Sequence, residues 1–311
     1  MRKIYSVGET VLDIIFKDGY PQAAKAGGSM LNSVVSLGRT GLPVFLISES
    51  GNDDVGDLID SFLKKNGVDT TYVTRFNDAN TSLALAFLNE TNDATYTFYK
   101  NYHPGKENKA YPETGQGDIL LCGSFYSIWQ ELRPQFRKLI TGAKENGSLV
   151  IYDPNIRKSH LIKNQDFRPV IIENMEASAI VRGSHEDFEY IFGTGNADET
   201  YDLIRSHCNI LVYTSSKDGV FVRTPSISEN FPVKKINPVS TIGAGDNFNA
   251  GMIACLYRKN ISRESLNLLD KDEWAEIAGT AVSFATHVCL SYENYISVEF
   301  AEAFNTGRSL T

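Results

Sequence analysis

Cysteine is scarce in this sequence, and the few cysteines are widely spaced. None of them forms a CxxC pair and most have apolar neighbours; they are Cys122, Cys208, Cys255 and Cys289. This spacing predicts buried free thiols rather than disulfides or zinc ligands, as is usual in a reducing compartment. We therefore expect a cytoplasmic location.

The sequence also lacks long hydrophobic runs and an excess of positive charge. No stretch approaches the roughly 20 apolar residues that a membrane span requires, and Glu9 and Asp13 interrupt any hydrophobic signal region. Lys and Arg number 30 against 38 Asp and Glu, which gives a formal charge of −8. Without a long-range positive field, neither a membrane nor a nucleic acid is an expected partner. An anionic ligand would have to be bound locally by amides, a few basic side chains or a metal ion.

The composition is that of an ordinary folded protein of 311 residues, 42% of them hydrophobic. Short apolar runs, typical of strands covered on both faces, alternate with patterns of helical spacing. The expected strands are residues 4–7, 43–47, 119–122, 149–152, 179–181 and 210–214, and the expected helices include 55–63 and 136–143. This alternation predicts a parallel sheet with helices on both faces. No repeat or linker-like stretch supports a second domain, so we expect one α/β domain over residues 1–311.

Two runs break this alternation. Residues 83–88 and 95–102 are separated by a polar turn segment, and the second run alternates in strand period, which predicts a β-hairpin with no helix after it. The hairpin is too aromatic for a purely solvated ribbon, so it should cover a ligand site or a partner subunit. We interpret it as a lid inserted at about residues 82–103, with residues 14–22 as a neighbouring lid strand.

The stretch 238–256, PVSTIGAGDNFNAGMIACL, is the most informative one in the sequence. Gly243, Ala244 and Gly245 form a turn of small residues, and apolar residues then recur with helical spacing, so a helix should begin at the glycines. Glycine lets a ligand approach the backbone there, and the unpaired amides of the first helical turn suit a phosphate. Asp246 would repel such an anion unless it takes a proton from the group that attacks the phosphate.

Other interpretations of this turn are open. Asp246 could simply cap the helix, because an Asp in the first turn complements the helix dipole. The stretch contains no GKS or GKT, so it is not a P-loop. It also lacks the third glycine of a Rossmann dinucleotide fingerprint.

A second stretch with glycines, GGSMLNSVVSLGRTG at residues 27–41, also begins a predicted helix. Leu31 and Val34 share one face of that helix and Asn32 lies off it, which is compatible with a surface Asn. Upstream, Asp13 follows the first expected strand, and in open α/β sheets ligands bind beyond the carboxyl ends of the strands. A carboxylate and an amide are suitable groups to hold a polyol, so we predict that Asp13 and Asn32 contact one.

Together, the stretch 27–41 and STIGAGDNFNAG at 240–251 resemble the two signatures of the PfkB family of ribokinase-like carbohydrate kinases. The resemblance spans nearly the whole chain. YDPNIR at 152–157 and FYK at 98–100 are similar to segments of the fructokinase and ketodeoxygluconate kinase branch. The resemblance implies a three-layer α/β/α sandwich with a mainly parallel central sheet and a small β-sheet lid. It also implies ATP-dependent phosphorylation of a sugar hydroxyl.

The resemblance further assigns roles to individual residues. It implies that Asp246 is the catalytic base and that Gly243, Ala244 and Gly245 form the anion hole. The implied substrate contacts are Asp13, Gly28, Asn32, Tyr99, Lys100, Asn155 and Arg157. The implied nucleotide contacts are Ser184, Asp187, Thr214, Ser216, Gly219, Gly243 and Gly245. No metal ligand is assigned.

Several positions depart from the family pattern. Ser240 stands where the family usually has an Asp that helps to hold a monovalent cation, so the resemblance supports ATP and Mg²⁺ but makes potassium doubtful. Ser184 and Asp187 correspond to the family's Asn and Glu near the magnesium site. The family's nucleotide turn corresponds to TSSKDG at 214–219, with Ser216 in place of a glycine.

Two rival functions stay open. A nucleotide-dependent oxidoreductase on a doubly wound sheet would require the missing third glycine. A non-catalytic sugar or nucleotide sensor that kept the fold would account for the three serines, but not for Asp246 and the intact glycines. Among kinases, YDPNIR and FYK favour fructose, or a related hexose or keto-sugar acid, over ribose or a nucleoside. As in many relatives, we expect a homodimer through the lid.

Overall fold

The computed structural model describes residues 2–89, 94–101, 111–156, 166–216 and 218–308. Its larger sheet is built from ten described strands: β1 (Ile4–Val7), β4 (Val44–Gly51), β5 (Val68–Asp69), β6 (Val73–Phe76), β9 (Ile119–Gly123), β10 (Leu149–Asp153), β11 (Ile180–Ser184), β12 (Leu211–Ser215), β13 (Gly219–Arg223) and β14 (Ser228–Phe231). They lie in the order β14-β13-β12-β11-β10-β9-β1-β4-β5, and β6 pairs with β4. Pairing is parallel from β12 through to β5, whereas β13 and β14 are antiparallel. The mainly parallel sheet is as predicted.

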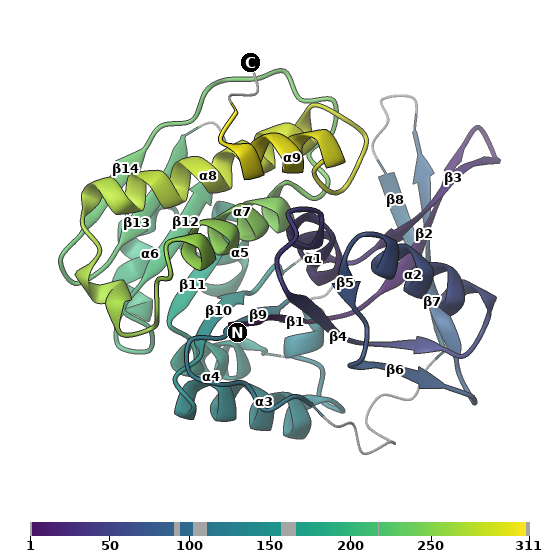
Figure 1. Cartoon of the computed structure of the whole chain (residues 1–311), viewed down its shortest axis with the longest axis horizontal. Helices are drawn as coiled ribbons and strands as arrows, with labels where there is room; N and C mark the ends of the chain where they lie inside the picture. Colours follow the sequence, from purple (N-terminus) through teal and green to yellow (C-terminus); the bar gives the residue numbers. More distant parts are fainter. Residues whose placement is uncertain (1, 90–93, 102–110, 157–165, 217, 309–311) are drawn as a thin grey trace.

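Helices cover both faces of this sheet (Figure 1). The described α-helices are α1 (Ser29–Arg39), α2 (Asp54–Lys65), α3 (Arg133–Glu145), α4 (Arg168–Ala177), α5 (His185–Phe192), α6 (Ala197–Ile204), α7 (Ala244–Arg258), α8 (Lys271–Cys289) and α9 (Val298–Thr306). Two short 3₁₀ helices, η1 (Phe125–Ser127) and η3 (Ser265–Leu268), lie between them.

Adjacent residues of the central strands pack into different cores. In β9, Ile119 and Leu121 join the core under α1, α7 and α8, whereas Leu120 and Cys122 join the core under α3, α4 and α5. Side chains alternate between the faces of a strand, so a strand buried on both faces must be apolar throughout. This is why the strands could be recognised as short apolar runs.

The small sheet, with the order β3-β2-β7-β8, projects from the side of the molecule (Figure 1). The predicted hairpin is confirmed, since β7 (Asn80–Leu88) and β8 (Ala94–Asn101) pair antiparallel. Residues 14–22, however, are not one strand: they span the turn of a second hairpin, β2 (Val11–Lys17) and β3 (Tyr20–Gly27). Asp18 and Gly19 both have positive φ, 53° and 80°. Asp-Gly accepts this conformation readily and therefore reverses the chain between two strands.

Two predictions from composition can be compared with the structure. Cys122, Cys208, Cys255 and Cys289 are all buried and free, as expected. Within the described ranges, none of the helices combines the length and the apolar character needed to cross a membrane.

His287 connects the end of α8 to the start of α9. Its Nε2 accepts a hydrogen bond from the N–H of Ser297 at 3.1 Å, and its ring packs on Phe300 with the centroids 4.4 Å apart. A ring nitrogen that accepts a hydrogen bond carries no proton. Burial lowers the pKa of His287, although the nearby Glu299 has a smaller, opposite effect. The fold therefore holds the neutral form of the ring.

This bond predicts how stability depends on pH. The folded-state pKa of His287 lies below its ordinary value of 6.5, so the stability from the neutral ring is fully present above that value and is lost as pH falls through the folded pKa. Between about pH 7 and pH 5, the melting temperature of the wild type should therefore fall more steeply than that of His287→Gln, which cannot titrate. Over this pH range, the wild type should lose about 1 kcal/mol more free energy of unfolding than the variant, which is the usual net contribution of one hydrogen bond. Parallel curves would contradict the assignment.

Candidate active site

The two stretches with glycines meet at the N-terminus of α7. Gly243, the N-cap of α7, has a φ of 77°, and a Cβ on it would lie 2.8 Å from the carbonyl oxygen of Asn294. Gly28, the N-cap of α1, has a φ of 124°, and a Cβ on it would clash with the carbonyl oxygen of Glu9. Each position requires glycine for both reasons. The first residues of both helices can therefore pack directly against the backbone of a neighbouring segment.

Asp246 lies in the first turn of α7 and is held by α1. Its Oδ1 accepts a hydrogen bond from Ser29 Oγ at 2.6 Å, and its Oδ2 accepts one from Asn32 Nδ2 at 2.8 Å. The hydroxyl of Ser33 donates to the backbone carbonyl of Asp246 at 2.8 Å. Asp246 is 6% exposed and Asn32 is 5% exposed. Asn32 is therefore not a surface residue. It lies on the polar side of α1, and α7 covers that side.

Asp13 approaches this point from the small sheet. It lies on β2 opposite Lys25 of β3, and a Cβ on Gly27 would overlap its Oδ2. The carboxylate therefore lies against Gly27, two residues before the start of α1. The structure thus brings together Asp13, Gly28, Asn32 and Asp246, which the sequence had selected separately.

The strand register decides which aromatic residue of the lid shares a face with Asp13. Asp13 pairs with Ala84, and Ala84 pairs with Phe98, so the three form one row across the sheet. Tyr99 belongs to the next row and points to the opposite face, where it is 58% exposed. Sequence reasoning selected Tyr99, whereas the register puts Phe98, and not Tyr99, on the face that carries Asp13. The side chain of Lys100 lies outside the described part of the structure.

Two of the predicted nucleotide contacts form a cap at the start of α5. The N–H and the hydroxyl of Ser184 donate to Oδ2 of Asp187 at 2.7 and 2.6 Å, and Oδ1 accepts the N–H of Ile156 at 2.7 Å. Burial, followed by the nearby Asp153 carboxylate, raises the pKa of Asp187, while the hydrogen bonds from Ser184 oppose this change. The pair holds α5 and the chain after β10 in place. Contact with a nucleotide stays a prediction for both residues.

Three more predicted nucleotide contacts lie where β12 ends and β13 begins. Thr214 is on β12, Ser216 follows that strand in a turn, and Gly219 is the first residue of β13. Asn155 follows β10 with a φ of 42°. Arg157 lies outside the described residues.

A buried ion pair next to α7 was missed by the sequence reasoning. Nη1 of Arg182 on β11 lies 2.8 Å from Oδ2 of Asp153, which ends β10. Asn249 of α7 donates to the same oxygen at 2.6 Å. Arg182 is 6% exposed and Asp153 is 1% exposed. The available signal was a charged residue inside the apolar run of β11, IVRGS.

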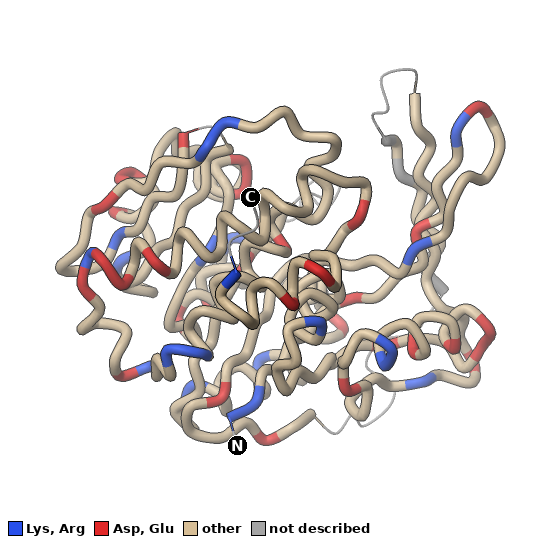
Figure 2. The backbone as a smooth tube through the Cα atoms, turned by 45° about the horizontal axis from the view of Figure 1, so that its top comes forward, with Lys and Arg blue, Asp and Glu red and all other residues tan. Residues whose placement is uncertain are grey.

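Acidic and basic residues are interspersed along the described chain (Figure 2). With a formal charge of −8, the protein must therefore bind an anion through local groups. At α7 these groups are the amides of the first turn, which carry the positive end of the helix dipole.

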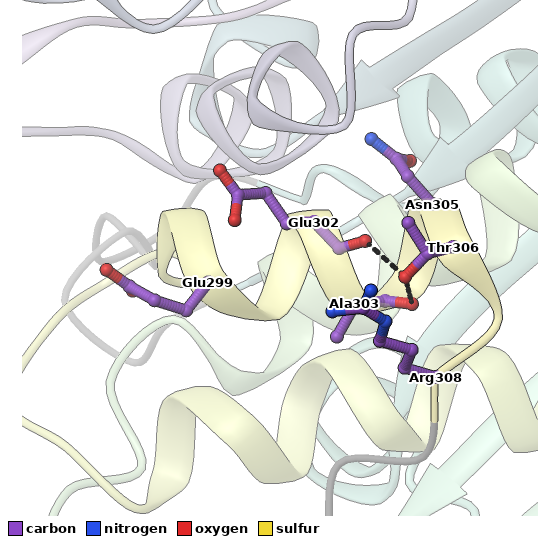
Figure 3. Close-up of a pocket in the computed structure, with 6 residues that line it drawn as sticks. All are labelled: Glu299, Glu302, Ala303, Asn305, Thr306 and Arg308. Atoms are coloured by element: carbon purple, nitrogen blue, oxygen red, sulfur yellow. Dashed lines mark hydrogen bonds between the residues drawn. The ribbon is translucent and has the colours of Figure 1, made fainter.

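Two surface depressions lie away from these groups. One, of about 340 Å³, is lined by side chains of α9 and the residues after it, including Glu299, Glu302 and Arg308 (Figure 3). The other, of about 520 Å³, is lined by residues that include Arg2 and Asp118. Neither includes a residue of the two signature stretches. No group of three or more His, Cys, Asp or Glu within the described ranges could hold a metal ion.

Known proteins similar to this chain are sugar and riboside kinases. A family model described as pfkB family carbohydrate kinase matches residues 1–288. Probable fructokinase-4 of Arabidopsis thaliana is 26% identical over 267 residues, which cover 81% of each chain. Aminoimidazole riboside kinase of Salmonella typhimurium is 28% identical over 267 residues, 84% of this chain and 82% of the relative.

Solved structures agree with the fold. Aminoimidazole riboside kinase from Salmonella enterica, complexed with aminoimidazole riboside and an ATP analogue, matches with a TM-score of 0.83 and 20% identity over 97% of this chain and 99% of that one. Fructokinase from Vibrio cholerae, in a form with bound fructose, ADP and calcium ion, matches with a TM-score of 0.84 and 21% identity over 98% and 99%. These matches confirm the ribokinase-like sandwich with its small second sheet. Because the family model covers most of its length, the chain belongs to the pfkB family of carbohydrate kinases and is a sugar phosphotransferase.

Proposed function

We propose that this chain transfers the γ-phosphate of ATP to a hydroxyl of fructose, or of a related hexose or keto-sugar acid, with Asp246 as the general base. The observation that carries the proposal is the contact of Asp246 with Ser29 and Asn32. It puts a carboxylate in the first turn of α7 and, at the same time, beside the residues of α1 expected to hold the sugar. The fructokinases among its relatives support the sugar, and the four buried thiols support a cytoplasmic location.

The chemistry follows from this arrangement. The sugar oxygen forms a bond to the γ-phosphorus, the bond from that phosphorus to the bridging oxygen breaks, and ADP leaves with the electron pair. Asp246 accepts the proton of the sugar hydroxyl as the new bond forms. Its hydrogen bonds to α1 orient it, and a carboxylate has lone pairs for further donors. The amides of Ala244, Gly245 and Asp246 stabilise the charge on the phosphoryl oxygens.

The sugar would lie between α7, α1 and the small sheet. Asp13, Gly28 and Asn32 would bind its hydroxyls, and the register of the small sheet adds Phe98 as a cover on the same face. Lys100, Asn155 and Arg157 complete the proposed substrate contacts, whereas the strand register turns Tyr99 to the face opposite Asp13. The proposed nucleotide contacts are Ser184, Asp187, Thr214, Ser216 and Gly219, with Gly243 and Gly245 at the phosphates.

Magnesium would be held mainly by the phosphates of ATP, as is usual for Mg²⁺ in kinases. Asp153 ends β10 and Asp187 lies three residues after the end of β11, and both carboxylates already accept hydrogen bonds from protein groups. Bound Mg²⁺ would neutralise part of the phosphate charge.

The first test is a panel of hexoses, pentoses, sugar acids and nucleosides, assayed for ADP formation with ATP and Mg²⁺. We expect fructose or a related hexose or keto-sugar acid to give the highest kcat/KM. Exchange of potassium for sodium should have little effect, because Ser240 supplies no carboxylate for a cation. A lack of ADP formation with every sugar would instead favour the non-catalytic sensor.

The second test removes the proposed base. Asp246→Asn keeps the shape of the side chain but cannot accept the proton, so kcat should fall by roughly 10² to 10⁴, with a smaller change in ATP affinity. Asp54→Asn is the matched control, because Asp54 also lies in the first turn of a helix, α2, and its replacement should leave kcat unchanged. Equal turnover of Asp246→Asn and the wild type would remove the base assignment.

We also propose a homodimer through the small sheet. On the face opposite Asp13, Phe16 stacks on Phe87 with the ring centroids 5.1 Å apart. Phe87 is 43% exposed and Tyr99 is 58% exposed on the same face. Aromatic side chains gathered on one open sheet face are typical of an interface.

Light scattering tests this interface. The wild type should have the mass of a dimer, and Phe87→Asp should give monomers, because a carboxylate would be buried without a partner. Leu268→Asp on η3 is the control, since Leu268 is an exposed apolar residue, 81% exposed, outside the small sheet. A monomeric wild type at high concentration would count against the proposal.

A further inference from the structure

Arg182 is a cation buried within the central sheet. Its Nη1 lies 2.8 Å from Oδ2 of Asp153 on β10, and its Nη2 donates to Oγ1 of Thr214 on β12 at 3.0 Å. Its guanidinium carbon lies 5.1 Å from the ring centroid of Phe248 on α7. Its Nε has no hydrogen-bond partner among the described residues. One side chain thus contacts two strands and the helix that carries Asp246.

Stability alone does not account for this ion pair. Removing two charges from water costs several kcal/mol per ion, and well-packed apolar residues in their place are often neutral or stabilising. The N-terminus of α7 also carries the positive end of a helix dipole, which disfavours a cation nearby. The buried pair of Arg182 and Asp153 is therefore costly at this position, and a bound anion beside the guanidinium would offset part of that cost.

The position of Arg182 shows where such an anion would bind. A Cβ on Gly245 would lie 3.0 Å from Nη1 of Arg182, so no side chain separates the guanidinium from the turn of amides. Thr214, its other neighbour, begins the 214–219 turn. Arg182 therefore connects the turn that carries the proposed base to the turn proposed to hold the nucleotide.

We propose that Arg182 is a positioning residue for the phosphate half of the site. Asp153 orients its guanidinium, and the guanidinium fixes Thr214 and the first turn of α7 relative to each other. Its positive charge also stabilises a polyphosphate bound at the amides of that turn. The inference rests on the proposed function, in that the anion is taken to be a nucleoside polyphosphate.

The test measures nucleotide binding without turnover. We expect Arg182→Met to weaken ADP binding, measured by calorimetry, by about 10- to 100-fold, and to raise the KM for ATP accordingly. Arg182→Lys keeps the charge but cannot hydrogen-bond Asp153 and Thr214 in the same planar geometry, so its ADP affinity should lie between those of Arg182→Met and the wild type. The dissociation constant of the sugar should change by less than about twofold, because the residues proposed to bind its hydroxyls, Asp13, Gly28 and Asn32, lie on or beside β2 and α1 and not on β11.

Two further variants separate this role from folding. Arg182→Met leaves Asp153 as a buried unpaired charge, so the double variant Arg182→Met with Asp153→Asn removes both charges and should weaken ADP binding to a similar degree. Arg223→Met is the matched control. Arg223 is 5% exposed and bonded to Asp198, but it pairs with Leu211 at the other end of the β12–β13 ladder from Thr214. Its loss should lower the melting temperature and leave ADP affinity unchanged.

The outcomes are distinct. A folded double variant that binds ADP as tightly as the wild type would overturn the inference, as would a loss of sugar affinity equal to the loss of ADP affinity. A wild type that binds ADP but phosphorylates no sugar would contradict the proposed function and leave the role of Arg182 to be decided by ADP binding.

Discussion

The hydrogen bonds between α1 and Asp246 are the constraint on which the site depends. Ser29 and Asn32 donate to the two oxygens of the carboxylate. The next residue of α7, Asn247, donates to the carbonyl of Asn294 at 2.8 Å, in the loop between α8 and α9. The first turn of α7 is therefore held between a helix near the start of the sequence and a loop near its end. The proposed base and the amides around it therefore keep one fixed relation to each other, as in-line transfer would require.

The same loop also connects this turn to the small sheet. Nζ of Lys25 on β3 donates to the carbonyl of Tyr292 at 3.0 Å and pairs with Glu293 at 2.9 Å. Gly243 lies against Asn294 of the same loop. Because Glu293 is half exposed, such a pair adds little to stability. It can therefore break and form again at little cost if the small sheet moves over a substrate.

Much of this site could be predicted from the sequence, because glycine turns and apolar strands are local signals. The contact of Asn32 with Asp246 could not, since helical periodicity shows which side of α1 is apolar but not that α7 covers its polar side. The sequence could not show that Phe98 shares a sheet face with Asp13. That depends on the strand register, and the register requires knowing that β2 pairs with β7. The second hairpin was missed although its Asp18-Gly19 turn was visible in the sequence.

The buried charges next to α7 would explain how this acidic protein binds a polyphosphate at the proposed site. Asp153 and Asp187 are both almost fully buried, and the pKa of Asp187 is raised by burial and then by Asp153. Without Arg182, these two carboxylates would lose the cation that contacts Asp153, and an anion at the first turn of α7 would meet only the partial charges of its amides. The guanidinium offsets one of the two negative charges and leaves the helix dipole available to a ligand. On the proposed function, the local balance of charge near Gly245, rather than the formal charge of the whole chain, would therefore set the affinity for an anion at this turn.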